Sequence, residues 1–151
     1  MSVKHVGVRE AHQMQTGDGY TYVDVRSVPE FESGHPDGAH NVPLLHYDAA
    51  TGRMAPNPDF LTVVQANYPP DAKLLLGCQV GGRSARAAMI LAANGYETVV
   101  NVKGGFGGQR DPATGQVVEE GWSQADLPVG TGSPDDVAYA ALSAKASGDT
   151  R

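Results

Sequence analysis

The sequence predicts an α/β fold, a single domain in which a parallel five-stranded sheet is flanked by helices. Five short segments rich in apolar and β-branched residues have the pattern of strands. Helical segments separate them, and strands joined through helices pair in parallel with right-handed crossovers. The chain has 151 residues, of which 40% are hydrophobic and 19% charged, which fits one globular domain over residues 1–151.

The first part of the chain alternates between strand and helix. An apolar patch at Val3–Val8 predicts a strand, and the helical composition of Arg9–Gln15 predicts a helix. Tyr20–Arg26 is rich in β-branched and aromatic residues with period-two alternation, which predicts the second strand. A serine cap and a proline in the first turn predict a short helix over Ser27–Ser33, and Ala39–Leu45 is the predicted third strand.

The middle of the chain repeats this alternation. Residues 46–58 contain one glycine and two prolines and are predicted to form a loop. Helical spacing predicts a helix over Asp59–Ala66, and the apolar run within Lys73–Gly77 predicts the fourth strand. Ser84–Asn94 is apolar nearly all round, so a largely buried helix capped by its first serine is expected. Thr98–Val102 is the predicted fifth strand.

The last part of the chain predicts an excursion and a closing helix. Residues 107–121 are rich in glycine and contain a turn signal at Asp111–Gly115. Ser133 is followed by a proline and two acidic residues, a pattern typical of a helix start. It predicts a C-terminal helix over residues 133–146 with a frayed end after it.

The turn after the fourth strand holds the single cysteine of the sequence, Cys78. A strand, a glycine-containing turn and a helix gather backbone N–H groups at the helix N-terminus, where they stabilise an anion. A sulfur placed there is favoured as the nucleophilic thiolate, although a lone cysteine is more often a small buried hydrophobic residue. We interpret Cys78 as a nucleophile in a backbone anion cradle. The predicted substrate- and anion-binding loop consists of Gln79, Val80, Gly81, Gly82, Arg83 and Ser84.

Charged residues are expected next to this loop. Ligand sites of open α/β sheets lie beyond the carboxyl ends of the strands, where the second and fourth strands both end. The residues predicted to brace the loop as a structural network are Asp24, Arg26, Glu30 and His35. Arg83 is either the counter-charge for an anionic substrate or a salt-bridge partner of Asp24 or Glu30, and the sequence leaves both roles open.

Composition excludes several other functions. The net charge is −6 and the 11 basic residues are scattered, which argues against nucleic acid as a partner. No apolar stretch approaches the roughly 18 residues that span a membrane. The five histidines and the one cysteine lack metal-ligand spacing, so neither a metal nor a cofactor is predicted. One cysteine and no signal-like apolar segment predict a reduced, cytoplasmic protein, and we expect a monomer or a weak homodimer.

Three motifs, in order along the chain, resemble signatures of the rhodanese family of sulfurtransferases, most closely its single-domain members. The first combines Tyr22–Arg26, Glu30–Phe31 and Gly34–Pro43; the second is Cys78–Ser84; the third combines Gly104–Phe106 with Asp126–Val129. The resemblance covers residues 5–130, the expected core of the domain. Pro36 stands where the family usually has an aliphatic residue, and residues 109–121 lengthen the third motif.

The resemblance implies a five-stranded parallel sheet and a thiosulfate sulfurtransferase. In the implied reaction, the Cys78 thiolate takes the outer sulfur of thiosulfate or of a persulfide. The resulting Cys78 persulfide then passes that sulfur to cyanide or a thiol. Sulfite leaves without being protonated, so a nucleophile and an anion cradle suffice and no general acid is needed.

Two other functions remain open. A cysteine-dependent phosphatase or arsenate reductase also places a Cys–Arg loop at a helix N-terminus, but those relatives have five residues between Cys and Arg. This chain has four, Gln79–Gly82, which form a smaller cradle that suits one sulfur atom better than three phosphate oxygens. The other alternative is a non-catalytic persulfide carrier or binding module with the same fold.

Overall fold

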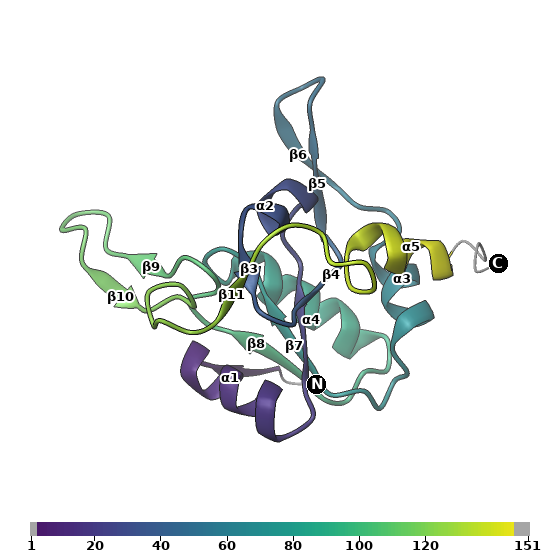
Figure 1. The fold of residues 1–151 in the computed structure, drawn as a ribbon, viewed down its shortest axis with the longest axis horizontal. Helices are drawn as coiled ribbons and strands as arrows, with labels where there is room; N and C mark the ends of the chain where they lie inside the picture. The colour runs from purple at the N-terminus through teal and green to yellow at the C-terminus, as the bar shows by residue number, and fades with distance from the viewer. Residues whose placement is uncertain (1–2, 147–151) are drawn as a thin grey trace.

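A parallel five-stranded sheet forms the centre of the molecule (Figure 1). The structure is a computed structural model that describes residues 3–146. In spatial order its strands are β1 (Lys4–Val6), β8 (Val99–Val102), β7 (Leu74–Gly77), β2 (Thr21–Asp24) and β4 (His40–Asn41). Each of its pairings is parallel. The predicted fold class is confirmed, and each predicted strand contributes to this sheet. Of the predicted strand Ala39–Leu45 only His40–Asn41 does so, and Leu45 lies in a separate hairpin.

Helices cover both faces of the sheet, because alternate residues of a buried strand point to opposite faces. Leu74 and Leu76 of β7 belong to one core cluster, and Leu75 belongs to the other. Residues of three helices pack in the first cluster: α3 (Phe60–Asn67), α4 (Gly82–Ala93) and α5 (Tyr139–Ala146). Residues of α1 (Val8–Gly17) and α2 (Val28–Ser33) pack in the second cluster, together with the fully buried Trp122. Among residues 3–146, no helix is long and apolar enough to cross a membrane.

Helix α4 differs from its prediction at its start and along its outer face. It begins at Gly82 with Gly81 as its N-cap, so Ser84 lies in the first turn and the prediction that it caps the helix was wrong. Gly81 has φ +110°, a left-handed conformation that favours glycine over the expected serine. The helix is also less buried than expected, since Met89 is 64% exposed.

The C-terminal helix also starts later than its capping signals predicted. Residues 135–137 form a turn, and α5 begins at Tyr139 instead of Ser133. The carbonyl of Val137 accepts a hydrogen bond from Asn41 N–H at 2.9 Å, so this segment completes the edge of the sheet beside β4. A tertiary contact thereby replaces the first helical turn. The predicted frayed end lies outside the described residues.

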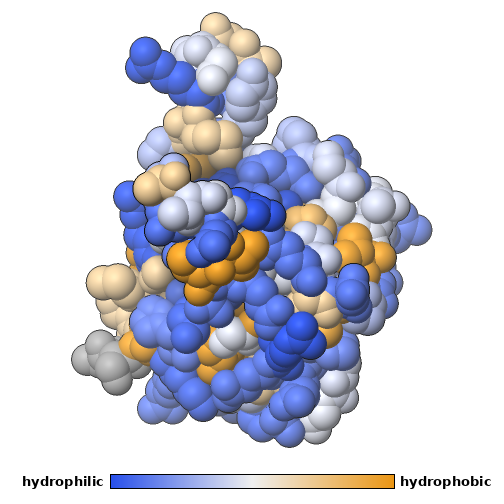
Figure 2. Space-filling model, turned by 90° about the vertical axis from the view of Figure 1, so that its left-hand side faces the viewer, coloured by the Kyte–Doolittle hydropathy of each residue, from blue (hydrophilic) through white to orange (hydrophobic). Residues whose placement is uncertain are grey.

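Two antiparallel hairpins extend from the domain (Figure 1). β5 (Leu45–Asp48) pairs with β6 (Arg53–Pro56), where a loop was predicted. β9 (Gln109–Arg110) pairs with β10 (Val117–Glu119) around the predicted turn. Figure 2 shows a mostly hydrophilic face with small hydrophobic patches. On β10, the exposed hydrophobic side chains are Val117 and Val118.

A third antiparallel pair joins two of the sequence motifs. β3 (His35–Pro36) pairs with β11 (Val129–Gly130), with Pro36 opposite Val129. The first and third motifs, almost a hundred residues apart along the chain, are therefore neighbours. Their pairing therefore joins a segment that precedes the cysteine loop in the chain to a segment that follows it.

Candidate active site

The candidate nucleophile lies at the carboxyl end of a central strand. Cys78 follows β7 directly and is 1% exposed. β2 and β8 flank β7, and Gly77 pairs with Asp24, so the loop starts beside the end of β2. A Cβ at position 77 would collide with the phenol of Tyr22, which explains why the residue before the cysteine is a glycine.

A backbone N–H and a hydroxyl group lie against the cysteine sulfur. The backbone N–H of Gly81 donates to Cys78 Sγ at 3.0 Å, and Ser84 Oγ lies 3.4 Å from the same atom. The left-handed conformation of Gly81 turns its N–H toward the sulfur just before α4 begins. N–H groups at the start of a helix stabilise negative charge, so this arrangement favours a thiolate.

Ser84 is also part of a buried polar contact that the sequence reasoning missed. Its hydroxyl lies 2.6 Å from Asn101 Oδ1, and Asn101 Nδ2 lies 3.0 Å from His5 Nδ1. Asn101 comes from β8 and His5 from the neighbouring β1, where the two residues pair in register. The available signal was Asn101 itself, a polar residue within an otherwise all-valine strand.

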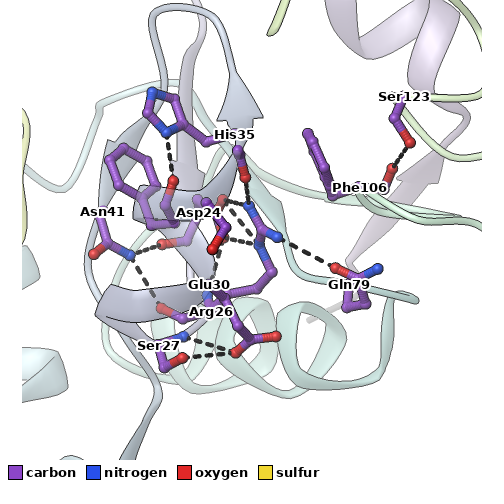
Figure 3. A network of polar contacts seen from close by, with 12 residues as sticks. Asp24, Arg26, Ser27, Glu30, His35, Asn41, Gln79, Phe106 and Ser123 are labelled. Atoms are coloured by element: carbon purple, nitrogen blue, oxygen red, sulfur yellow. Dashed lines mark hydrogen bonds and ion pairs between the residues drawn. The ribbon is translucent and has the colours of Figure 1, made fainter. Parts of the chain in front are cut away.

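Arg26 connects β2 to the cysteine loop (Figure 3). Its guanidinium donates to the Asp24 carboxylate, with Nε at 3.0 Å and Nη2 at 2.8 Å, and to Gln79 Oε1 at 3.2 Å. Asp24 and Arg26 are only 1% and 3% exposed. The ring of Phe106 covers the guanidinium at 4.6 Å, and charge-assisted hydrogen bonds shielded in this way hold Gln79 in a fixed place.

Arg83, at the far end of the loop, pairs with Glu30 of α2. Nη1 and Nη2 donate to the two carboxylate oxygens at 2.8 and 3.0 Å, a bidentate geometry. Of the two salt-bridge partners that the sequence suggested, the structure selects Glu30. The same carboxylate accepts hydrogen bonds from the N–H and hydroxyl of Ser27. Burial disfavours the charged form of Glu30, but the hydrogen bonds from Arg83 and Ser27 outweigh it and lower its pKa to about 2.

The remaining predicted supporting residue lies apart from these two pairs. His35 Nδ1 is 2.7 Å from the carbonyl of Phe31, and the two rings stack at 3.8 Å. These contacts attach His35 to α2 and not to the cysteine loop. The structure therefore brings three of the four predicted supporting residues, Asp24, Arg26 and Glu30, into the two pairs that reach the loop.

Replacing Glu30 with glutamine is expected to make the fold less sensitive to acid. The Glu30 pKa falls from its ordinary value of 4.5 to about 2 in the folded protein, so the ionised group stabilises the fold above about pH 4.5. That stabilisation is lost as the pH falls through about 2. The paired side chains are 22% and 33% exposed, which limits the contribution to about 1 kcal/mol.

Urea unfolding near pH 7 and near pH 2 measures this difference. The free energy of unfolding of the wild type should fall by about 1 kcal/mol more than that of Glu30→Gln. Glu97→Gln, which changes an exposed carboxylate after α4, is the control. Equal losses in the wild type and Glu30→Gln would contradict the assignment of this ion pair as acid-sensitive.

The backbone of the third motif holds the loop from the other side. Phe106 N–H donates to the carbonyl of Cys78 at 2.7 Å, and Gly107 N–H donates to that of Gln79 at 2.9 Å. Gly105 has φ +56°, and a Cβ there would collide with the Cys78 carbonyl. The loop is thus enclosed by backbone contacts that leave no room for a side chain at position 105.

A cavity of about 450 Å³ lies beside the Arg83–Glu30 pair. The β5–β6 hairpin contributes Tyr47 and Met54 to its wall, and these side chains are 53% and 39% exposed.

Across residues 3–146, no group of three or more His, Cys, Asp or Glu side chains is placed to hold a metal ion.

The fold and the loop define an α/β protein that presents one cysteine sulfur to hydrogen-bond donors at the start of a helix. Residues 8–109 match the family model described as Rhodanese-like domain. The match covers well over half of the chain, and the protein belongs to the rhodanese-like family.

Relatives and solved structures agree with this assignment. The chain is 39% identical over 101 residues to thiosulfate sulfurtransferase 16, chloroplastic, of Arabidopsis thaliana, covering 67% of this chain and 82% of that protein. It is 39% identical over 88 residues to the mitochondrial protein HIGH ARSENIC CONTENT 1 of Arabidopsis thaliana, covering 58% of this chain and 51% of that protein. A crystal structure from M. tuberculosis superposes with a TM-score of 0.69 at 24% identity, covering 87% of this chain and all of that one. The likeness to that structure supports the fold alone.

Proposed function

We propose that this protein is a thiosulfate sulfurtransferase that carries a sulfane sulfur on Cys78. Membership of the rhodanese-like family and relatives named thiosulfate sulfurtransferase support sulfurtransferase activity in general. The observation that carries the specific proposal is the placement of Cys78 Sγ against the Gly81 N–H at the start of α4. This contact stabilises a sulfur anion before and after the transfer.

The proposed reaction has two displacement steps. The Cys78 thiolate attacks the outer sulfur of thiosulfate, a new S–S bond forms, and sulfite leaves with the electron pair of the broken bond. Cyanide or a thiolate then attacks the outer sulfur of the persulfide. The products are thiocyanate or a new persulfide, and the Cys78 thiolate is regenerated, so neither step needs a proton donor.

Phosphate or arsenate chemistry is the main competing function. The loop has four residues between Cys78 and Arg83, and the guanidinium of Arg83 is engaged by Glu30. Both features reduce the room and the free positive charge available to a tetrahedral oxyanion. Because the name of one relative refers to arsenic content, arsenate stays in the test.

The purified protein is expected to form thiocyanate from thiosulfate and cyanide without releasing phosphate from p-nitrophenyl phosphate or reducing arsenate. Thiocyanate, p-nitrophenol and arsenite are measured in parallel on the same preparation. Phosphate release or arsenate reduction without thiocyanate formation would overturn the proposal. A sulfur adduct on the intact protein without turnover would instead support the alternative of a non-catalytic persulfide carrier.

Cellular location and assembly stay predictions. The expected cytoplasmic location rests on the sequence, whereas two of the matched relatives carry the words chloroplastic and mitochondrial in their names. The expected monomer or weak homodimer is testable by light scattering of the purified chain.

A further inference from the structure

A chain of three polar side chains connects the candidate nucleophile to the edge of the sheet. Ser84 Oγ lies 3.4 Å from Cys78 Sγ and 2.6 Å from Asn101 Oδ1, and Asn101 Nδ2 lies 3.0 Å from His5 Nδ1. Cys78, Ser84 and Asn101 are 1%, 0% and 4% exposed. His5 is exposed on β1, the edge strand. The path therefore runs from a buried sulfur to solvent.

Ser84 has one hydroxyl proton and three acceptors within reach. They are Asn101 Oδ1 at 2.6 Å, the carbonyl of Gly81 at 3.2 Å and Cys78 Sγ at 3.4 Å. A hydroxyl donates to one acceptor at a time. With the amide oxygen of Asn101 facing the serine, the shortest contact takes the proton, and the hydroxyl gives no hydrogen bond to the sulfur.

His5 decides which end of the Asn101 amide faces Ser84. The Nδ2 group of Asn101 can donate to His5 Nδ1 only while that nitrogen has a free lone pair. When His5 is doubly protonated, two donors face each other, and a half turn of the amide restores both hydrogen bonds. Asn101 Oδ1 then accepts from His5, and Nδ2 donates to Ser84 Oγ. The proton of Ser84 is then free to go to Cys78 Sγ, because a thiolate is a stronger acceptor than the neutral carbonyl of Gly81.

We infer that His5, Asn101 and Ser84 form a proton-sensitive relay in which protonation of His5 directs the Ser84 hydroxyl onto the Cys78 sulfur and increases its thiolate fraction. A hydrogen bond to the charged form of a group favours that form. Ser84 and Asn101 are thus positioning residues for the nucleophile. The inference rests on the proposed role of Cys78 as a nucleophile but not on the identity of its sulfur donor.

Other charged groups lie on the elements that flank the relay. Lys4 precedes His5 on β1 and pairs with Glu10 of α1, and Lys103 follows β8 and pairs with Glu119 of β10, both at 3.9 Å. The titratable groups that interact electrostatically with Cys78 include Arg83 and Tyr22. Lysine, glutamate, arginine and tyrosine side chains titrate in water outside the range of about pH 5 to 8, whereas histidine changes its charge within that range.

The test is the rate at which iodoacetamide alkylates Cys78, followed by intact mass across about pH 5 to 9. A simple thiol loses one decade of rate per pH unit below its titration midpoint. In the wild type the alkylation rate should fall less steeply with decreasing pH between about pH 5 and 8. At the acid end of this range it should be about 3- to 10-fold above the rate extrapolated for a simple thiol, which is the simple line. His5→Phe should restore the simple line. A simple line in the wild type would overturn the relay.

A double-mutant cycle separates the relay from a direct effect of histidine charge on sulfur. In the Ser84→Ala protein, adding His5→Phe should change nothing, because the hydroxyl that conveys the signal is gone. The same cycle with Asn101→Leu provides a second, independent measurement. If His5→Phe had equal effects with and without Ser84, the coupling would act through space and the relay would be wrong.

Two further variants complete the experiment. Asn101→Asp presents a carboxylate that holds the serine proton away from the sulfur at every pH, so alkylation should slow at the acid end of the range, where the wild-type relay would direct that proton to the sulfur. His46→Phe, on the β5–β6 hairpin, should leave the profile unchanged. Alkylation needs no sulfur donor, so the two proposals can fail separately. A relay that works in a protein without sulfurtransferase activity would refute only the proposed function. Thiocyanate formation by a protein whose alkylation follows that of a simple thiol would refute only the relay.

Discussion

Cys78→Ser is expected to abolish sulfur loading and thiocyanate formation, with a loss on the order of 10⁴-fold or more. The hydroxyl is nearly the same size as the thiol and can accept the Gly81 N–H, so the loop should keep its shape. A serine hydroxyl stays protonated at neutral pH and is a poor nucleophile toward sulfane sulfur. Intact mass after incubation with thiosulfate should show one added sulfur atom on the wild type and none on the variant.

The control for this experiment is the thermal unfolding midpoint of both proteins. Similar midpoints would show that activity was lost with the nucleophile and not with the fold. A sulfur adduct that persists on Cys78→Ser would contradict the assignment, because Cys78 is the one cysteine of the chain.

Gly105→Ala is expected to be severely damaging although it leaves every loop side chain in place. Gly105 has φ +56°, and an alanine Cβ would meet the carbonyl oxygen of Cys78 and lie 2.9 Å from the carbonyl carbon of Gln79. Left-handed strain and the clash together should lower the free energy of unfolding by more than about 2 kcal/mol. Relief of the clash must shift the loop backbone, so sulfur loading should fall as well.

Gly52→Ala is the matched control for backbone strain. Gly52 has φ +70° in the turn of the β5–β6 hairpin, and its Cβ would meet nothing within 4 Å. This variant should show only the left-handed cost of about 1 to 2 kcal/mol, with sulfur loading unchanged. Urea unfolding and intact mass on both variants measure the comparison. If Gly105→Ala loaded sulfur as fast as Gly52→Ala, the enclosure of the loop by position 105 would have no functional meaning.

The strands of the central sheet were predictable because their signal is local. An apolar run such as Leu74–Leu76 is compatible with few positions other than a buried strand, and Gly77 marks where the run ends. The β5–β6 hairpin gave no such signal. Most of its side chains are partly or fully exposed, so no apolar alternation distinguishes its strands from a loop.

Local helix signals were less reliable where a tertiary contact competed with them. Ser133 and Pro134 form a good capping pattern, but the adjoining segment hydrogen bonds to the edge strand β4 through Val137 and Asn41. A serine at position 84 also looked like a cap, yet the chain needs the left-handed turn of Gly81 three residues earlier to place an N–H on the sulfur. In both cases packing decided where the helix begins.

The sequence by itself determined the α/β class, the order of the five parallel strands along the chain and the position of Cys78 at the start of a helix. These features depend on periodicity and on residues that are adjacent in the chain. Only the tertiary structure decided which side chains meet around the sulfur. Arg26 meets Gln79 across 53 residues and His5 meets Asn101 across 96, because parallel pairing places distant strand ends side by side. A single sequence carries no local signal for such contacts, so the choice of Glu30 over Asp24 as the partner of Arg83 and the polar path from Cys78 to His5 emerged only with the fold.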